Sequence, residues 1–123
     1  LLPIAIGQMR LENTLGRQAN RLLVCDTDLL ETKVYSEVYY GGYCDPLLEK
    51  YAQENQYDLY FLTGIDVPWE ADDLRDKPRE REEMFSHFRE ALVESNRSFV
   101  ILRGNRQERL EKARFHIDKL LNP

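Results

Sequence analysis

The chain has 123 residues, of which 42% are apolar and 32% charged, and its formal net charge is −5. This length suits one domain, and the composition supports a packed core rather than general disorder. An acidic chain is not expected to bind nucleic acid or an anionic membrane surface, because both need a basic face. No apolar run approaches the roughly 18 residues of a membrane span, and two cysteines are too few for a disulfide scaffold or a zinc site. We therefore expect a soluble, acidic, cytoplasmic single domain.

Helical periodicity alternates with short apolar runs in the first part of the chain. A helix is predicted over 5–20, followed by a strand over 22–25. Its continuous apolar run (LLVC) is typical of a strand covered on both faces in a parallel sheet. Thr27 or Asp28 is placed to cap the next helix, with Glu31 in its first turn. That helix carries three apolar side chains on one face: Leu30, Val34 and Val38.

The pattern continues with a loop, a helix and two further strands. Paired glycines at 41–42 predict a loop. The Asp45-Pro46 pair opens a helix to about Asn55, because proline suits the first helical position after an Asp cap. Strands are predicted over 57–62 and 98–102 from their apolar runs.

Two amphipathic helices complete the predicted order, one over 78–94 and one from about 107 to 121. The second presents an apolar face that we expect to point inward: Leu110, Ala113, Ile117, Leu120 and Leu121. Strands separated by helices require crossover connections, so we predict an α/β fold with a parallel sheet. Ligands of such sheets bind beyond the carboxyl ends of the strands, here at 26–28, 63–69 and 103–105.

Asp26 and Asp28 follow the first predicted strand. An acid at the end of a buried strand can hold Mg²⁺, directly or through water, or accept a proton from a substrate hydroxyl. Both are candidate catalytic acids, and Asp26 is the candidate metal ligand. The alternative for Asp28 is a helix N-cap without a chemical role.

A charged segment spans residues 70–83, where 11 of 14 residues are charged, seven acidic and four basic. One interpretation is a solvated helix face. The other is a lid, at about 69–83, whose arginines clamp phosphate oxygens and exclude water from the transfer step. The candidate lid residues are Arg75, Arg79 and Arg81.

Loops supply the remaining candidates. Trp69 could stack on a ring of a ligand, and a place in the core fits the sequence equally. Tyr40 beside the paired glycines either walls a ring or pins its own loop. Gly104 and Asn105 are a candidate nucleotide-binding loop, since glycine lets backbone approach a base; an ordinary strand-to-helix turn explains the same two residues.

Three segments resemble a known family. LLVCDTDLLET, YDLYFLTGIDVPWEADDLRD and REREEMFSHFREAL are similar to the ribosylnicotinamide kinase domain of NadR-type proteins, which are P-loop NTPases with many AAA-type relatives. The most specific parts are D-T-D after the strand and W-x-x-D-D-x-x-R. The resemblance implies a three-layer parallel sheet flanked by helices. It also implies Mg²⁺-dependent transfer of the ATP γ-phosphate to the 5′-hydroxyl of nicotinamide riboside, which gives nicotinamide mononucleotide.

The resemblance also implies roles for single residues. Asp26 matches the Walker-B-like acid near Mg²⁺ and the attacking hydroxyl, and Asp28 matches a second acid on the substrate side. Asp72, Asp73 and Arg75 match the family's lid stretch, which often reads D-D-G-x-R and is one residue longer there.

The chain contains no G-x-x-x-x-G-K-[ST] motif, which in this family lies N-terminal to the segments above. We therefore expect residues 1–123 to be the C-terminal two-thirds of one P-loop kinase-like domain, without its first strand and P-loop, inactive alone and reliant on a partner chain or further residues. The expected ligands are ATP, Mg²⁺ and a small-molecule nucleoside, without nucleic acid or membrane, and a homo-oligomer is compatible with this. The alternatives are a nucleotide-binding regulatory module without catalysis, an ATPase or kinase with another acceptor, and an interaction domain.

Overall fold

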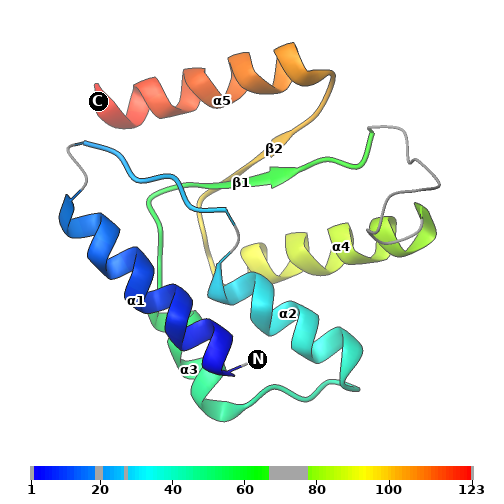
Figure 1. Ribbon diagram of the computed structural model, residues 1–123. Helices are drawn as coiled ribbons and strands as arrows, with labels where there is room; N and C mark the ends of the chain where they lie inside the picture. Colours follow the sequence, from blue (N-terminus) through cyan, green and yellow to red (C-terminus); the bar gives the residue numbers. More distant parts are fainter. Residues whose placement is uncertain (1, 19–20, 27, 67–77, 123) are drawn as a thin grey trace. The chain divides into compact units, whose positions relative to one another are not determined.

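A computed structural model describes residues 2–18, 21–26, 28–66 and 78–122 of the protein (Figure 1). Its elements in chain order are α1 (Leu2–Gln18), α2 (Leu29–Tyr39), α3 (Pro46–Glu54), β1 (Tyr60–Thr63), α4 (Pro78–Glu94), β2 (Phe99–Leu102) and α5 (Arg106–Leu121). The chain divides into two compact units, residues 1–56 and residues 57–123. The described part of the first unit is helical, and the second unit is α/β.

Three mutually packed helices, α1 to α3, form the first unit. Its core consists of Ala5, Leu29, Leu48 and Ala52, each at most 1% exposed. The two alanines let the helix backbones approach closely around the two leucines. In α2, Leu30 and Val34 are buried as predicted. Val38, in the last turn, is exposed.

Side-chain caps fix the starts of α2 and α3, as predicted. The carboxylate of Asp28 accepts a hydrogen bond from the Glu31 N–H at 2.8 Å, and that of Asp45 accepts one from the Leu47 N–H at 2.9 Å. Each bond satisfies a donor that the first helical turn leaves open. The predicted loop between these helices is also confirmed. Its two glycines have φ values of 62° and 88°, which other residues rarely adopt.

The strand predicted over 22–25 is wrong. These residues form neither helix nor strand, and Leu22, Leu23 and Val24 are 42%, 38% and 74% exposed. A strand needs a neighbour to pair its backbone N–H and C=O groups. The described part of the first unit offers only helices. The apolar run is therefore not assigned to a strand.

Two parallel strands form the sheet of the second unit, with Tyr60 opposite Phe99 and Thr63 opposite Leu102. The prediction of a parallel α/β arrangement is confirmed for this pair, although β1 begins three residues later than expected. Lys112 on α5 donates a hydrogen bond to the Ile101 carbonyl at 3.0 Å. That contact satisfies a backbone acceptor of β2, which is one way in which proteins protect a sheet edge.

The helices of this unit follow the sequence pattern to different degrees. The predicted bounds of α4 are confirmed, and its Met84 and Leu92 are buried. The inward face predicted for α5 is partly wrong, because Leu110 and Leu120 are 53% and 43% exposed. A 16-residue helix is about 24 Å long, whereas a four-residue strand spans about 13 Å. The strands therefore cover only part of the apolar face of α5.

Candidate functional site

The carboxyl ends of β1 and β2 lie side by side and lead into two loops that touch. The Gly64 N–H, just after β1, donates to the Leu102 carbonyl at 2.7 Å. A Cβ atom at Gly64 would lie 3.0 Å from that carbonyl oxygen and from Cγ of Arg103. Only glycine fits this approach without displacing a neighbour. The strand-end rule thus identifies a real junction between the two loops.

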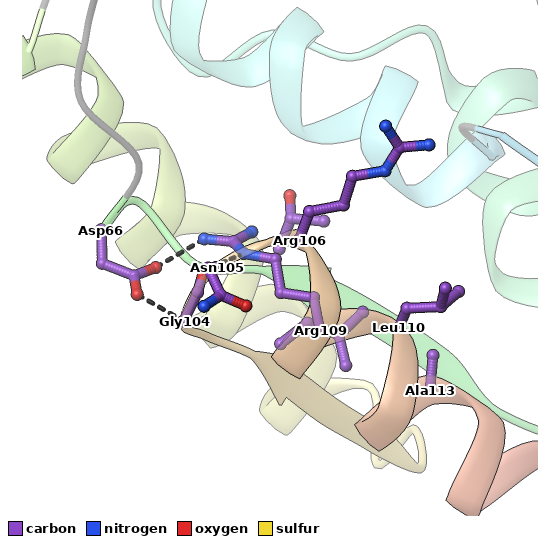
Figure 2. Close-up of a pocket in the computed structure, with 9 residues that line it drawn as sticks. Asp66, Gly104, Asn105, Arg106, Arg109, Leu110 and Ala113 are labelled. Carbon is purple, nitrogen blue, oxygen red and sulfur yellow. Dashed lines mark hydrogen bonds and ion pairs between the residues drawn. The ribbon is translucent and has the colours of Figure 1, made fainter.

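Asp66 connects the loop after β1 to the loop after β2 (Figure 2). Its Oδ2 accepts a hydrogen bond from the Gly104 N–H at 2.6 Å, and its Oδ1 lies 2.5 Å from Nη2 of Arg109. The Gly104 N–H and then the nearby arginine charges hold the pKa of Asp66 below its usual value. The carboxylate therefore stays charged at neutral pH and keeps both contacts.

Arg109, in the second turn of α5, reaches back to the same loops. Its Nε donates to the Gly104 carbonyl at 2.8 Å, and its Nη2 donates to the Gly64 carbonyl at 3.1 Å in addition to the Asp66 contact. The guanidinium is planar and carries several donors in fixed directions. A single side chain thus joins backbone from both loops.

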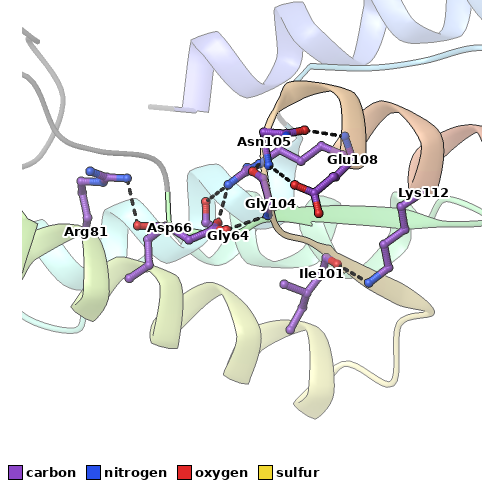
Figure 3. Close-up of polar contacts among 10 residues, drawn as sticks. Gly64, Asp66, Arg81, Ile101, Gly104, Asn105, Glu108 and Lys112 are labelled. Carbon is purple, nitrogen blue, oxygen red and sulfur yellow. Dashed lines mark hydrogen bonds and ion pairs between the residues drawn. The ribbon is translucent and has the colours of Figure 1, made fainter.

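A capping box starts α5 (Figure 3). The Asn105 side chain accepts from the Glu108 N–H at 2.8 Å, and the Glu108 carboxylate accepts from the Asn105 N–H at 3.1 Å. Gly104, immediately before the cap, has a φ of 95°. The ordinary strand-to-helix turn considered for Gly104 and Asn105 is therefore present. It does not conflict with ligand binding, because both residues also line a cavity.

That cavity measures about 880 Å³ and opens beside the strand ends. It lies between the ends of β1 and β2, the two loops and the first turns of α5, and is lined by Thr63, Asp66, Leu102, Gly104, Asn105, Arg106, Arg109, Leu110 and Ala113. Figure 2 shows Leu110 and Ala113 on the first turns of α5, beyond the loop residues. A wall of aliphatic side chains beside a rim of backbone and charged groups suits a planar ring that carries polar substituents.

Arg81 holds the loop after β1 from α4, as Figure 3 shows. Its Nη2 donates to the Ile65 carbonyl at 3.3 Å. Arg81 and Arg109 thus bind successive carbonyls of one loop, at Ile65 and Gly64. Arg81 was predicted to clamp phosphate from a lid; in this structure it contacts backbone at the strand end.

The predicted acids lie in the first unit. Asp26 is exposed on the segment before α2, and Asp28 is the N-cap of that helix. Nearby Glu31 has a pKa raised to about 7, chiefly by burial and then by the charges of Asp28 and Asp26. Tyr40, at the C-cap of α2, is 63% exposed. Asp26 and Asp28 therefore lie at the start of α2, whereas Tyr40 lies at its other end.

Several predicted residues fall outside the described part of the chain. These are Trp69 and Arg75, together with Asp72 and Asp73, and with them most of the segment interpreted as a lid. Arg79 belongs to α4, but its side chain also lies outside the described residues. Their roles stay predictions.

Two searches of the described residues bear on metals and membranes. Within 2–18, 21–26, 28–66 and 78–122, no three His, Cys, Asp or Glu side chains are placed to hold a metal ion together. In the same residues, none of the helices combines the length and the apolar character that crossing a membrane requires.

Sequence reasoning missed Asp66 and Arg109, which the structure places at the centre of the strand-end junction. Asp66 lies in the range 63–69, which was predicted to be a strand end near a ligand, but no role was predicted for Asp66 itself. The available signal for Arg109 was its place one turn after the Asn105 cap. From there a long side chain can reach back to the preceding loop.

Comparison with known proteins identifies the family. A family model described as an AAA domain matches residues 1–109. The chain belongs to this AAA domain family. The domain is also 30% identical over 99 residues to the trifunctional NAD biosynthesis/regulator protein NadR of Escherichia coli K12, and 29% identical over 99 residues to the protein of the same name in Salmonella typhimurium LT2. The resemblance to NadR-type P-loop NTPases is thereby confirmed.

The extent of these matches is uneven. Each alignment covers 79% of this chain but only 24% of the length of the relative. The chain thus spans about a quarter of the length of the curated relatives it matches. No solved structure matches it.

Proposed function

We propose that this AAA domain is part of an ATP-dependent nucleoside kinase that phosphorylates nicotinamide riboside to nicotinamide mononucleotide. The likeness to NAD biosynthesis/regulator proteins supports the pathway, and the AAA family supports nucleotide binding. The structural observation that carries the proposal is the cavity at the carboxyl ends of β1 and β2, with Gly104 and Asn105 on its rim. In a three-layer α/β kinase, this is where a nucleotide is expected.

In this proposal the cavity takes the base of ATP. Leu102, Leu110 and Ala113 offer apolar surface to the faces of a purine, and the side-chain NH₂ group of Asn105, which also lines the cavity, offers a donor to its edge. The open geometry of the cavity leaves one side for the sugar and the phosphates. The phosphates themselves would lie on a P-loop, which supplies backbone N–H groups, a lysine and a hydroxyl that residues 1–123 lack.

Asp26 is the proposed acid of the transfer step. In kinases Mg²⁺ is commonly held by one or two carboxylates together with substrate phosphates, so a single exposed carboxylate fits this requirement. Bound Mg²⁺ would neutralise charge on the transferred phosphoryl group. Asp26 would also orient the attacking 5′-hydroxyl, with Asp28 and the ring of Tyr40 or Trp69 on the substrate side. Arg75, Arg79 and Arg81 remain proposed lid residues.

The test supplies the complete gene product that contains this chain with ATP, Mg²⁺ and nicotinamide riboside, and measures nicotinamide mononucleotide by chromatography. Asp26→Asn should lower turnover by orders of magnitude if the carboxylate acts on the metal or the hydroxyl. The matched control is Asp58→Asn, an exposed carboxylate before β1, which should leave turnover unchanged. Equal rates for both variants would refute the role of Asp26. Activity only on another acceptor would refute the substrate.

A nucleotide-binding regulatory module is the second candidate, and the word regulator in the names of both relatives favours it. It predicts ATP or pyridine-nucleotide binding by calorimetry without any phosphorylated product. The same preparation of protein distinguishes the two candidates.

A further inference from the structure

Asp66 and Arg109 together contact both backbone polar groups of Gly104. The Gly104 N–H donates to Asp66, and the Gly104 carbonyl accepts from Arg109 Nε. The two side chains also pair with each other, which closes a ring of contacts between α5 and the two loops. The orientation of the Gly104 backbone is thus set by a pair of residues 43 positions apart in the sequence.

The start of α5 does not depend on this pair. The capping box of Asn105 and Glu108 satisfies the first turn by itself, and β1 is joined to β2 through its ladder and through the Gly64 N–H. Removing the Arg109 guanidinium would leave these contacts in place. It would release the Gly64 and Gly104 carbonyls, so the two loops that line the cavity would lose the side chain that binds a carbonyl of each.

The cavity rim is where this matters, because Asp66, Gly104 and Arg109 all line the cavity. The Nε and Nη2 groups of Arg109 donate to the protein's own backbone and to the Asp66 carboxylate. These contacts fix the position of the guanidinium in the cavity wall.

We propose that the Asp66–Arg109 pair is a positioning device that sets the shape of the cavity and thereby its discrimination between nucleotide bases. This inference rests on the proposed function, because it takes the cavity to receive the base of ATP. Neither residue needs to touch the phosphates. The pair should therefore affect recognition of the base and not of the polyphosphate.

The experiment measures binding of ATP, GTP and inorganic tripolyphosphate by calorimetry to the complete gene product. The variants are Arg109→Gln, Asp66→Asn and the double variant, with Arg109→Lys as the conservative change. Arg114→Gln, an exposed arginine of the same helix, is the matched control. Asp66→Asn keeps one oxygen as an acceptor for the Gly104 N–H, while it removes the charge and puts an NH₂ group where an oxygen accepts from Arg109. It therefore remains informative if Arg109→Gln folds poorly.

We expect each single variant to weaken ATP binding about tenfold, as for loss of a charged hydrogen bond, and to move the ATP-to-GTP affinity ratio toward one. Tripolyphosphate binding should not change. The double variant should be little worse than either single variant, because the two residues act as one unit, and Arg109→Lys should restore part of the loss.

Contrary results separate this inference from the function on which it rests. If the unmodified protein binds ATP and the variants keep its affinity and its ATP-to-GTP ratio, the positioning role is wrong and nucleotide binding stands. Equal losses for ATP and tripolyphosphate would also overturn it, because they would place the pair at the phosphates. If the unmodified protein binds neither nucleotide, the proposed function fails and this inference fails with it.

Discussion

The partly buried carboxyl group of Glu31, in the first turn of α2, should make the free energy of unfolding depend on pH. Burial, and then the charges of Asp28 and Asp26, raise its pKa from 4.5 to about 7. The folded chain therefore holds this proton more tightly than the unfolded chain. The stability that Glu31 contributes is complete below about pH 4.5 and is lost as the pH rises through about 7.

The size of the effect follows from the pKa change. A rise from 4.5 to about 7 corresponds to about 3 kcal/mol at 1.36 kcal/mol per unit. Because Glu31 is only partly buried, solvent screening reduces this value, and we expect about 1–2 kcal/mol. Glu31→Gln removes the titration while keeping the shape of the side chain.

The assay is urea unfolding followed by circular dichroism at pH 5 and pH 8, with EDTA to remove metal ions. When the pH rises from 5 to 8, the free energy of unfolding of Glu31→Gln should increase by about 1–2 kcal/mol relative to that of the unmodified protein. The control is Glu49→Gln, an exposed glutamate in the first turn of α3. It loses the same helix-dipole contribution of about 0.3–1 kcal/mol and should show no such gain. If the stability of Glu31→Gln depends on pH in the same way as that of the unmodified protein, burial does not raise the pKa of Glu31.

Two further substitutions test the core and the strand-end loop through the same unfolding assay. Leu48→Ala should lower the free energy of unfolding by about 2–5 kcal/mol because Leu48 is 1% exposed, whereas Leu47→Ala, at 38% exposure, should lower it by less; equal losses would contradict the assigned core. Gly104→Ala should destabilise by about 1–3 kcal/mol, because φ is 95° and the new Cβ would lie 2.9 Å from Cδ of Glu108. Gly7→Ala, in a helix with no heavy atom within 4 Å of the added Cβ, should stabilise by about 0.5–1 kcal/mol. A stable Gly104→Ala variant would show that this turn tolerates another conformation.

The elements with local signals were predictable from the sequence. The bounds of α4 and the start of α3 follow from a proline at the first helical position and from a 3.6-residue apolar period. The caps at Asp28, Asp45 and Asn105 depend on contacts within three residues. Such interactions are complete within a short stretch of chain. The sequence therefore contains all the information that they need.

Residues 22–25 show what a local signal leaves out. Their apolar run has the composition of a covered strand, yet ladder hydrogen bonds need a second strand at the right edge, and composition does not say which segment provides it. β1 and β2 satisfied this condition for each other. The same reasoning explains α5. The periodicity places its apolar residues on one side of the helix, but Leu110 and Leu120 stay exposed because the short strands cover only part of that side.

The strand-end junction was likewise predictable only in part: its loops could be located from the sequence, but the contacts between them could not. Parallel topology directed attention to the loops after β1 and β2, and Gly104 with Asn105 was singled out there. Arg81 and Arg109 bind those loops chiefly through the backbone carbonyls of Ile65, Gly64 and Gly104. Every residue has a carbonyl, so no side-chain pattern marks an acceptor of this kind. The sequence therefore does not distinguish an arginine such as Arg109, which positions backbone, from an arginine that binds phosphate. The contacts in the folded chain make that distinction.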